Sequence, residues 1–124
     1  MTVLMFQPQF APLVESGDKP HTIRPARKRL IRVGDRLSLR RWSGVAYRSK
    51  QVILRETRCK SLSAVYINET FQEIIFVVNG ERLNQEQWVK LARDDGFACT
   101  TDMLDWFRKT HGLPFNGILI TWEV

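Results

Sequence analysis

The sequence has no long hydrophobic run and no recognisable targeting segment. Its longest uninterrupted apolar stretch extends only from Ile74 to Val78, whereas a helix that crosses a bilayer needs about 20 apolar residues. The first residues, from Met1 to Phe6, lack the positively charged flank and the small-residue cleavage site of a signal peptide. We therefore expect a cytoplasmic protein without a membrane partner.

Cysteine and histidine are also scarce. The two cysteines, Cys59 and Cys99, are 40 positions apart, and neither belongs to a Cys-x-x-Cys pair or a Cys/His cluster. This pattern excludes a disulfide framework and contains no zinc-ligand spacing. We expect two reduced thiols, no metal site and no cofactor.

The remaining composition is that of an ordinary globular domain. The 124 residues are 44% hydrophobic and 26% charged, a balance far from that of disordered or disulfide-rich chains. The length suits one hydrophobic core and is short for two. Because no internal repeat or low-complexity tract divides the chain, we expect residues 1–124 to form a single domain.

Positive charge is concentrated in the first half of the chain. The net charge is +6, but residues 21–60 hold 13 Lys and Arg against only Asp35 and Glu56, whereas residues 61–124 hold 5 against 9 acidic residues. A basic block of this kind attracts polyanions, most often phosphate backbones. A solvated basic face is the alternative, and it stays open. The residues expected to contact RNA are Arg27, Lys28, Arg29, Arg36, Arg40 and Arg41.

The hydrophobic pattern predicts short strands with helices between them. Asn79-Gly80 between two strand-like runs is typical of a type I′ hairpin, and Asn84 with Gln87 forms a capping-box pattern that begins a helix. Residues 51–67 are rich in β-branched residues and predict one or two antiparallel strands. The predicted fold class is α+β, with a mixed β-barrel of five or six strands and two or three helices packed outside. The two later helices are expected at 84–94 and 101–111, packed through Trp88, Leu91, Met103 and Phe107.

One short segment gathers several chemically useful side chains. Lys19, His21, Thr22 and Arg24 lie within six residues, between a predicted helix end at Gly17 and a predicted strand. In a strand, Thr22 and Arg24 point to the same face, so both can line one pocket. A desolvated Lys can act as a base or a cation, Thr as a nucleophile or donor, and Arg as a phosphate ligand. A polar turn that leads into a strand is the alternative explanation.

Two further residues have both a functional and a structural interpretation. His21, next to the motif, can relay protons near neutral pH, or it can be merely structural. Trp42 is the only tryptophan in the basic half of the chain and follows two arginines. A base can stack on it, or it can pack inside the barrel, and these two interpretations are equally supported.

The order of several short motifs resembles the ASCH domain, a relative of the PUA domain. The motifs are Gly17-x-Lys19-x-x-Thr22-Ile23-Arg24, Val33-Gly34-Asp35-Arg36-Leu37, Asp95-Gly96-Phe97 and a helix through Trp106-Phe107. Together they cover nearly the whole chain. The resemblance implies a PUA-like β-barrel with a cleft where the first helix meets the barrel, and RNA as the proposed ligand.

The same resemblance implies a second possible activity. Some small ASCH proteins are amidohydrolases that act on N4-acetylcytidine through a Lys and a Thr three residues apart and a Glu from a later helix end. Lys19 and Thr22 match that pair, and Asp95 stands where the Glu is expected. Other ASCH proteins are described as ribonucleases. We therefore keep two hypotheses. The first is an RNA- or nucleotide-binding module, with Arg24, His21 and Trp42 as ligand contacts. The second is an amidohydrolase, with Lys19, Thr22 and Asp95 as catalytic residues. The sequence gives no indication of an oligomeric state.

Overall fold

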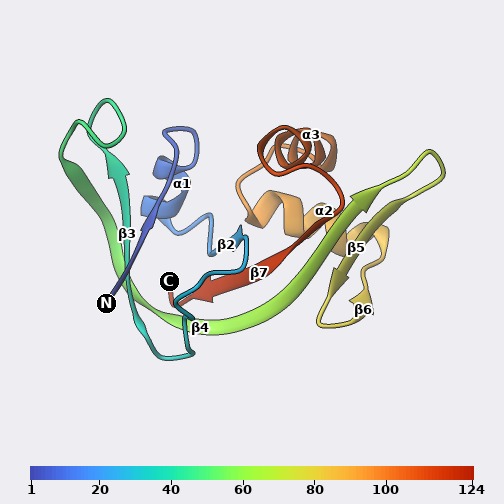
Figure 1. The fold of residues 1–124 in the computed structure, drawn as a ribbon, viewed down its shortest axis with the longest axis horizontal. Helices are drawn as coiled ribbons and strands as arrows, with labels where there is room; N and C mark the ends of the chain where they lie inside the picture. Colours follow the sequence, from blue (N-terminus) through green and yellow to red (C-terminus); the bar gives the residue numbers. More distant parts are fainter.

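The computed structural model describes residues 1–124 as a mixed α+β fold, with a seven-stranded sheet and three helices (Figure 1). None of the helices is both long and apolar enough to span a membrane. Helices α1, α2 and α3 all lie on the concave side of the curved sheet. The elements are β1 (Thr2–Met5), α1 (Ala11–Ser16), β2 (His21–Arg24), β3 (Arg36–Trp42), β4 (Gln51–Glu69), β5 (Ile74–Val78), β6 (Glu81–Arg82), α2 (Gln85–Asp94), α3 (Thr100–Thr110) and β7 (Phe115–Trp122).

Strand β4 connects the two halves of the sheet. It is one continuous strand of 19 residues. Its first part pairs antiparallel with β3, and from Cys59 onward it pairs with β7 and then also with β5. Register shifts occur in both the β3 and β7 pairings, between Leu39 and Arg40 and between Cys59 and Ser61. Because such irregularities bend a strand, they accompany the strong curvature of β4 in Figure 1.

The sheet is open, so the expected closed barrel of five or six strands is not found. One edge is β1, which pairs only with β3, and another is β2, which pairs only with β7. Both strands have only four residues, and no pairing joins them. The Arg24 side chain spans the opening instead, because its Nη2 donates a hydrogen bond to the main-chain oxygen of Met5 at 2.7 Å. We call this opening between β1 and β2 the seam.

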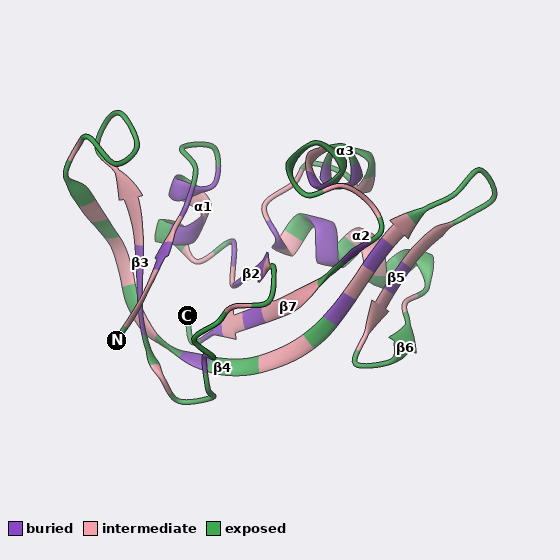
Figure 2. Ribbon diagram, viewed as in Figure 1, coloured by how far each residue is buried: buried purple, intermediate pink, exposed green.

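Two hydrophobic clusters lie along the concave side of the sheet, one at each end of β4. The first cluster includes Phe10 and Val14 of the α1 region packed with β1, β3 and β7. The second contains side chains of α2 and α3, both of which carry buried residues in Figure 2. Met103 and Phe107 are fully buried. The predicted packing of both helices is confirmed, with Leu91 buried and Trp88 partly buried against the same cluster.

Local sequence signals account well for the turns and helix ends. Asn79 and Gly80 both have positive φ angles, 52° and 80°, as a type I′ turn requires, and they join β5 to β6. Asn84 accepts a hydrogen bond from the main-chain N–H of Gln87, and the Gln87 side chain accepts one from Asn84 N–H. The predicted hairpin and capping box are therefore both confirmed.

Candidate functional site

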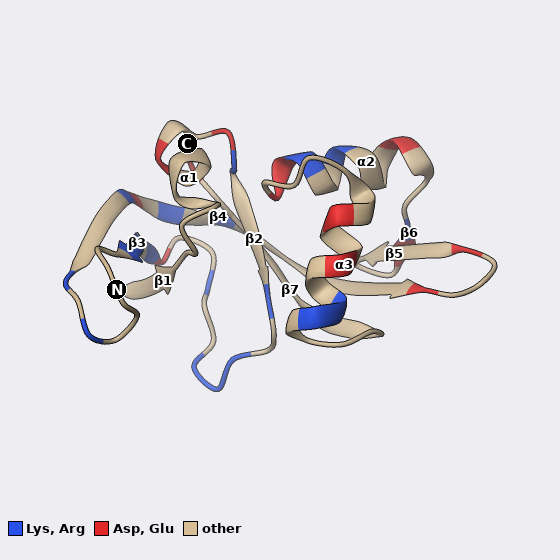
Figure 3. Cartoon of the chain, turned by 90° about the horizontal axis from the view of Figure 1, so that it is seen from above, with Lys and Arg blue, Asp and Glu red and all other residues tan.

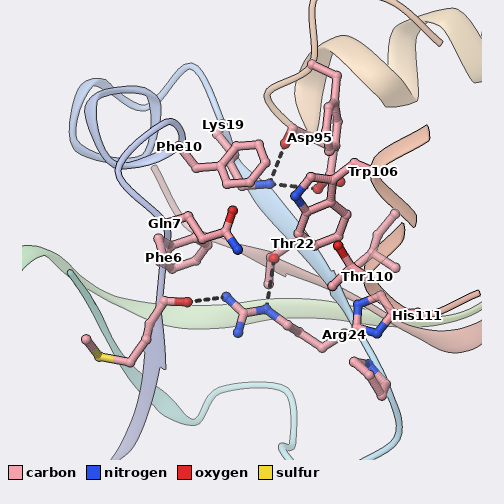
Figure 4. A pocket seen from close by; sticks show the side chains of 14 residues that line it. Phe6, Gln7, Phe10, Lys19, Thr22, Arg24, Asp95, Trp106, Thr110 and His111 are labelled. Atoms are coloured by element: carbon pink, nitrogen blue, oxygen red, sulfur yellow. Dashed lines mark hydrogen bonds and ion pairs between the residues drawn. The ribbon is translucent and has the colours of Figure 1, made fainter. Parts of the chain in front are cut away.

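A cleft of about 250 Å³ opens at the seam, between the start of α1, strand β2 and the last turn of α3 (Figure 4). Its polar groups come mostly from the predicted motif and from the end of α2. Phe6, Gln7 and Phe10 form one wall, and Trp106, Thr110 and His111 form the opposite wall. The four polar residues expected to act together, Lys19, Thr22, Arg24 and Asp95, all line this cleft.

Lys19 and Asp95 form a buried ion pair at the inner end of the cleft. The Lys19 ammonium donates to Oδ1 of Asp95 at 2.7 Å and to the main-chain oxygen of the same residue at 2.5 Å. Both residues are nearly inaccessible, with 2% and 4% exposure. The reach of an aspartate is therefore sufficient at the position where the ASCH resemblance implies a glutamate. The Lys19 ammonium also lies over the Phe10 ring, 5.1 Å from its centroid.

A glycine allows this pair to form. Asp95 ends α2, and Gly96 follows with a φ of 96°, a left-handed conformation that turns the chain back toward the cleft. A Cβ atom at Gly96 would lie 3.0 Å from the Phe10 ring and 3.3 Å from Lys19 Cδ. The positive φ favours glycine at this position, and a side chain there would crowd Phe10 and Lys19.

Burial shifts the pKa values of the paired groups in opposite directions. Desolvation lowers the pKa of Lys19, and the charge of Asp95 offsets only part of that effect. Desolvation raises the pKa of Asp95 to about 6, again against the opposing effect of Lys19. The two groups are therefore closer in proton affinity than free Lys and Asp, which suits a site that transfers protons near neutral pH.

Thr22 and Arg24 project from the same face of β2, as predicted. Arg24 Nε donates to Thr22 Oγ1 at 3.1 Å, and the guanidinium lies 4.9 Å from the centre of the Phe6 ring. Burial, together with Arg27, lowers the pKa of Arg24 to about 10, so it stays charged at neutral pH. Because the Thr22 oxygen accepts from a cation, its own proton remains available to a ligand or a base.

His21 lies behind the cleft rather than in it. Its side chain is buried, and its Nε2 is 3.5 Å from Asp95 Oδ1 without any hydrogen-bond partner. Burial and the charge of Lys19 lower the pKa of His21 to about 4, so the ring is neutral at physiological pH. His21 therefore contacts the ion pair and does not line the cleft.

Trp42 is not part of the cleft and not part of either hydrophobic cluster. It ends β3 partly buried, with its ring 5.1 Å from that of Tyr47. Together with Arg41 it lines a separate, shallow groove beside α1. The packing of Trp42 inside a barrel is therefore not found, and stacking of a base on Trp42 stays a prediction, now placed at this groove.

The predicted phosphate contacts divide into two groups. Arg27, Lys28 and Arg29 lie in the loop that follows β2, which projects from the sheet in Figure 3. Helices α2 and α3 carry both acidic and basic side chains, whereas the connection between β4 and β5 is flanked by acidic ones. The second group belongs to β3: Arg36 is exposed, Arg40 donates to Ser38 Oγ and Gln51 Oε1 at 2.8 Å each, and Arg41 donates to Trp42 O at 3.2 Å.

The aromatic walls of the cleft were not predicted from the sequence. Phe10, Phe97 and Trp106 contact one another with ring centroids 5.3 to 5.9 Å apart, so the two walls of the cleft meet at these rings. Trp106 is partly buried and packs against both hydrophobic clusters, and it also lines the cleft. The only available signal was that Phe97 and Trp106 belong to the motifs that resemble ASCH domains.

No group of three or more His, Cys, Asp and Glu side chains is placed to hold a metal ion. Comparison of the chain with protein-family models, with curated proteins and with solved structures found no match.

Proposed function

We propose that the cleft at the seam binds a nucleoside-like molecule, either free or as an unpaired nucleotide of RNA. The observation that carries this proposal is the composition of the cleft. Lys19, Thr22, Arg24 and Asp95 supply donors and acceptors, while aromatic side chains form the walls. Flat, polar-edged bases fit such a site, because their faces stack on aromatic rings and their edges form hydrogen bonds.

The size of the cleft favours a small ligand. Its 250 Å³ is slightly below the range of roughly 300 to 1,000 Å³ that is usual for ligand clefts. A single nucleoside is in keeping with that volume, whereas a peptide or an extended oligonucleotide would have to continue outside it. Arg24 is the fixed positive charge of the site and is suited to a phosphate or a carbonyl oxygen of the ligand.

The basic residues that follow β2 favour RNA as the source of the ligand. The loop with Arg27, Lys28 and Arg29 begins just after Pro25, which lines the cleft, and the charge of Arg27 contributes to the lowered pKa of Arg24. Phosphates next to a bound nucleotide would meet these side chains first. Arg36, Arg40, Arg41 and Trp42 lie on β3 and would contact only a longer strand.

We further propose that the chain is an ASCH-type domain with a PUA-like architecture. Support comes from the motif residues themselves, since Lys19, Thr22 and Arg24 meet Asp95 from the later motif in one cleft beside α1. The strongly curved sheet is compatible with a PUA-like barrel that is left open at the seam.

Amide hydrolysis is the second candidate function, and the buried Lys19–Asp95 pair beside Thr22 favours it. In N4-acetylcytidine, water or the Thr22 hydroxyl would add to the acetyl carbonyl. Lys19, in the neutral amine form that its lowered pKa makes more accessible, would accept the proton released. Breaking the amide C–N bond then transfers that proton to the departing 4-amino group. If Thr22 attacks, water hydrolyses the acetyl ester in a second step. Either route consumes one water and yields cytidine and acetate.

The test is calorimetric titration of the purified protein with cytidine, N4-acetylcytidine and a short unstructured RNA, combined with an assay for acetate release. We expect at least one of the three ligands to bind. Arg24→Gln should weaken that binding, whereas Arg82→Gln, on β6 and away from the cleft, should leave it unchanged. Absence of binding by all three ligands would refute the proposal, and binding without acetate release would leave only the binding function.

A further inference from the structure

Strand β2 has one edge that no other strand uses. It pairs with β7 through the register His21 to Thr121 and Arg24 to Ile118. One residue before β2, the N–H of Trp122 donates to the oxygen of Pro20. Hydrogen-bonded pairs alternate with non-bonded pairs along antiparallel strands. Counting from Pro20, the N–H and C=O groups of Thr22 and Arg24 point toward β7, and those of Ile23 point away from it.

The main chain of Ile23 therefore faces the seam. Ile23 lines the cleft, yet its side chain belongs to the second hydrophobic cluster on the opposite face of β2. The part of Ile23 that borders the cleft is thus its peptide N–H and C=O. No strand pairs with this edge of β2, and none of the hydrogen bonds outside the regular elements involves Ile23.

These two main-chain groups are nearly buried, because Ile23 is only 3% exposed. Buried N–H and C=O groups without a partner are rare in proteins, since each costs about as much as a lost hydrogen bond. When such a donor and acceptor lie side by side at the base of a cleft, a bound ligand can supply the missing hydrogen-bond partners. The flanking side chains Thr22 and Arg24 point into the same cleft and can hold the remainder of that ligand.

We propose that the main chain of Ile23 reads the edge of the bound base. Its N–H donates to a ring nitrogen of the base, and its C=O accepts from the neighbouring amino group. Cytosine carries this arrangement in its N3 and 4-amino groups, and N4-acetylcytosine keeps one N–H at the same position. The inference rests on the proposed nucleoside-binding function and names the substrate class as pyrimidines with an acceptor–donor edge.

The direct test replaces the Ile23 amide with an ester, by incorporation of the corresponding α-hydroxy acid. This change removes the N–H and keeps the side chain. Cytidine should bind about tenfold more weakly, the loss expected for one hydrogen bond in a dry site. The matched control is the same replacement at Ile120, the β7 partner of Thr22, which does not line the cleft and whose N–H belongs to the β2–β7 ladder. That control should lower the melting temperature more and the cytidine affinity less.

A second measurement uses the unmodified protein and two analogues of cytidine. One analogue, 3-deazacytidine, lacks the ring acceptor, and the pyrimidin-2-one riboside lacks the 4-amino donor. Each should bind about tenfold more weakly than cytidine, and the Ile23 ester should no longer distinguish cytidine from 3-deazacytidine. Equal affinities of the unmodified protein for cytidine and 3-deazacytidine would overturn the inference and leave the proposed function intact. Failure of every nucleoside and RNA to bind would overturn both.

Discussion

The Lys19 ammonium lies 2.7 Å from Asp95 Oδ1, although 76 positions separate the two residues in the chain. The contact joins the loop after α1 to the end of α2 and thus links the two halves of the molecule. A buried ion pair of this kind contributes little net stability when intact, but loss of one partner leaves the other charge buried and uncompensated.

Removal of one partner of this pair should therefore destabilise the fold more than removal of both. Lys19→Met and Asp95→Leu should each lower the free energy of unfolding by about 3 to 5 kcal/mol, and the double variant should lose less than either single variant. Urea denaturation of the four proteins measures this cycle. Losses below about 1 kcal/mol in both single variants would contradict the burial of the pair.

Asp95 and His21 should give opposite dependences of stability on pH in the same range. The pKa of Asp95 is raised from 3.8 to about 6, so its contribution to stability is complete below pH 3.8 and is lost as pH rises through 6. The pKa of His21 is lowered from 6.5 to about 4, so its contribution is complete above pH 6.5 and is lost as pH falls through 4. Each shift corresponds to roughly 3 kcal/mol.

Single variants should separate these two effects. Relative to the unmodified protein, His21→Asn should become less stable as pH rises from 4 to 6, because only the Asp95 contribution remains. Asp95→Asn should show the reverse trend, because only His21 then titrates. Chemical denaturation at several pH values measures both slopes, and identical slopes in the two variants would show that neither shift is present.

The Thr22 hydroxyl should be required for any hydrolysis of N4-acetylcytidine. Thr22→Val keeps the shape of the side chain and removes the oxygen, and it should lower kcat by at least about 100-fold. Thr22→Ser keeps the oxygen and should retain most of the activity. Both variants also need cytidine affinities and melting temperatures, because loss of the Arg24 contact alone would weaken binding. Full activity of Thr22→Val would remove Thr22 from the catalytic assignment.

Binding of single-stranded RNA should depend strongly on salt. If four or five side chains neutralise phosphates, log affinity should fall against log salt with a slope of about −3, at about −0.7 per contact. Arg27→Glu with Lys28→Glu should weaken binding and flatten that slope. The control pair has to lie away from the cleft, which excludes Arg108 and Lys109 because the next two residues of the chain line it.

A better control for the RNA experiment is Arg82→Glu with Lys90→Glu, on β6 and α2. It changes the net charge by the same amount outside the basic half of the chain. We expect this pair to have little effect on affinity. Equal losses from both double variants would indicate diffuse attraction without a defined RNA site.

The second hydrophobic cluster should depend on Phe107, which is fully buried. Phe107→Ala should lower the free energy of unfolding by about 3 to 5 kcal/mol, since it removes apolar contacts and leaves a cavity. Phe71→Ala is the matched control, because Phe71 is fully exposed in the β4–β5 turn and its loss should change stability by less than about 0.5 kcal/mol. Similar losses in both variants would contradict the described core.

Local features of the fold could be predicted because their causes lie within a few residues. The Asn79-Gly80 turn depends on two residues that tolerate positive φ, and the cap at Asn84 depends on a partner three positions later. The common face of Thr22 and Arg24 follows from the two-residue period of a strand. In each case, the local backbone geometry follows directly from the residue types and their spacing.

Features that need distant segments to meet were decided only by the tertiary structure. Strand β4 is continuous because β3, β5 and β7 pair with different parts of it. From the sequence alone, residues 51–67 were compatible with either one strand or two. The seam stays open because β1 and β2 are short edge strands joined only by the Arg24 side chain. The sequence by itself determined which polar residues lie near one another on β2. Packing of α2 and α3 onto the sheet determined that Asp95 and the aromatic walls complete the cleft, because hydrophobic burial specifies positions that no local pattern encodes.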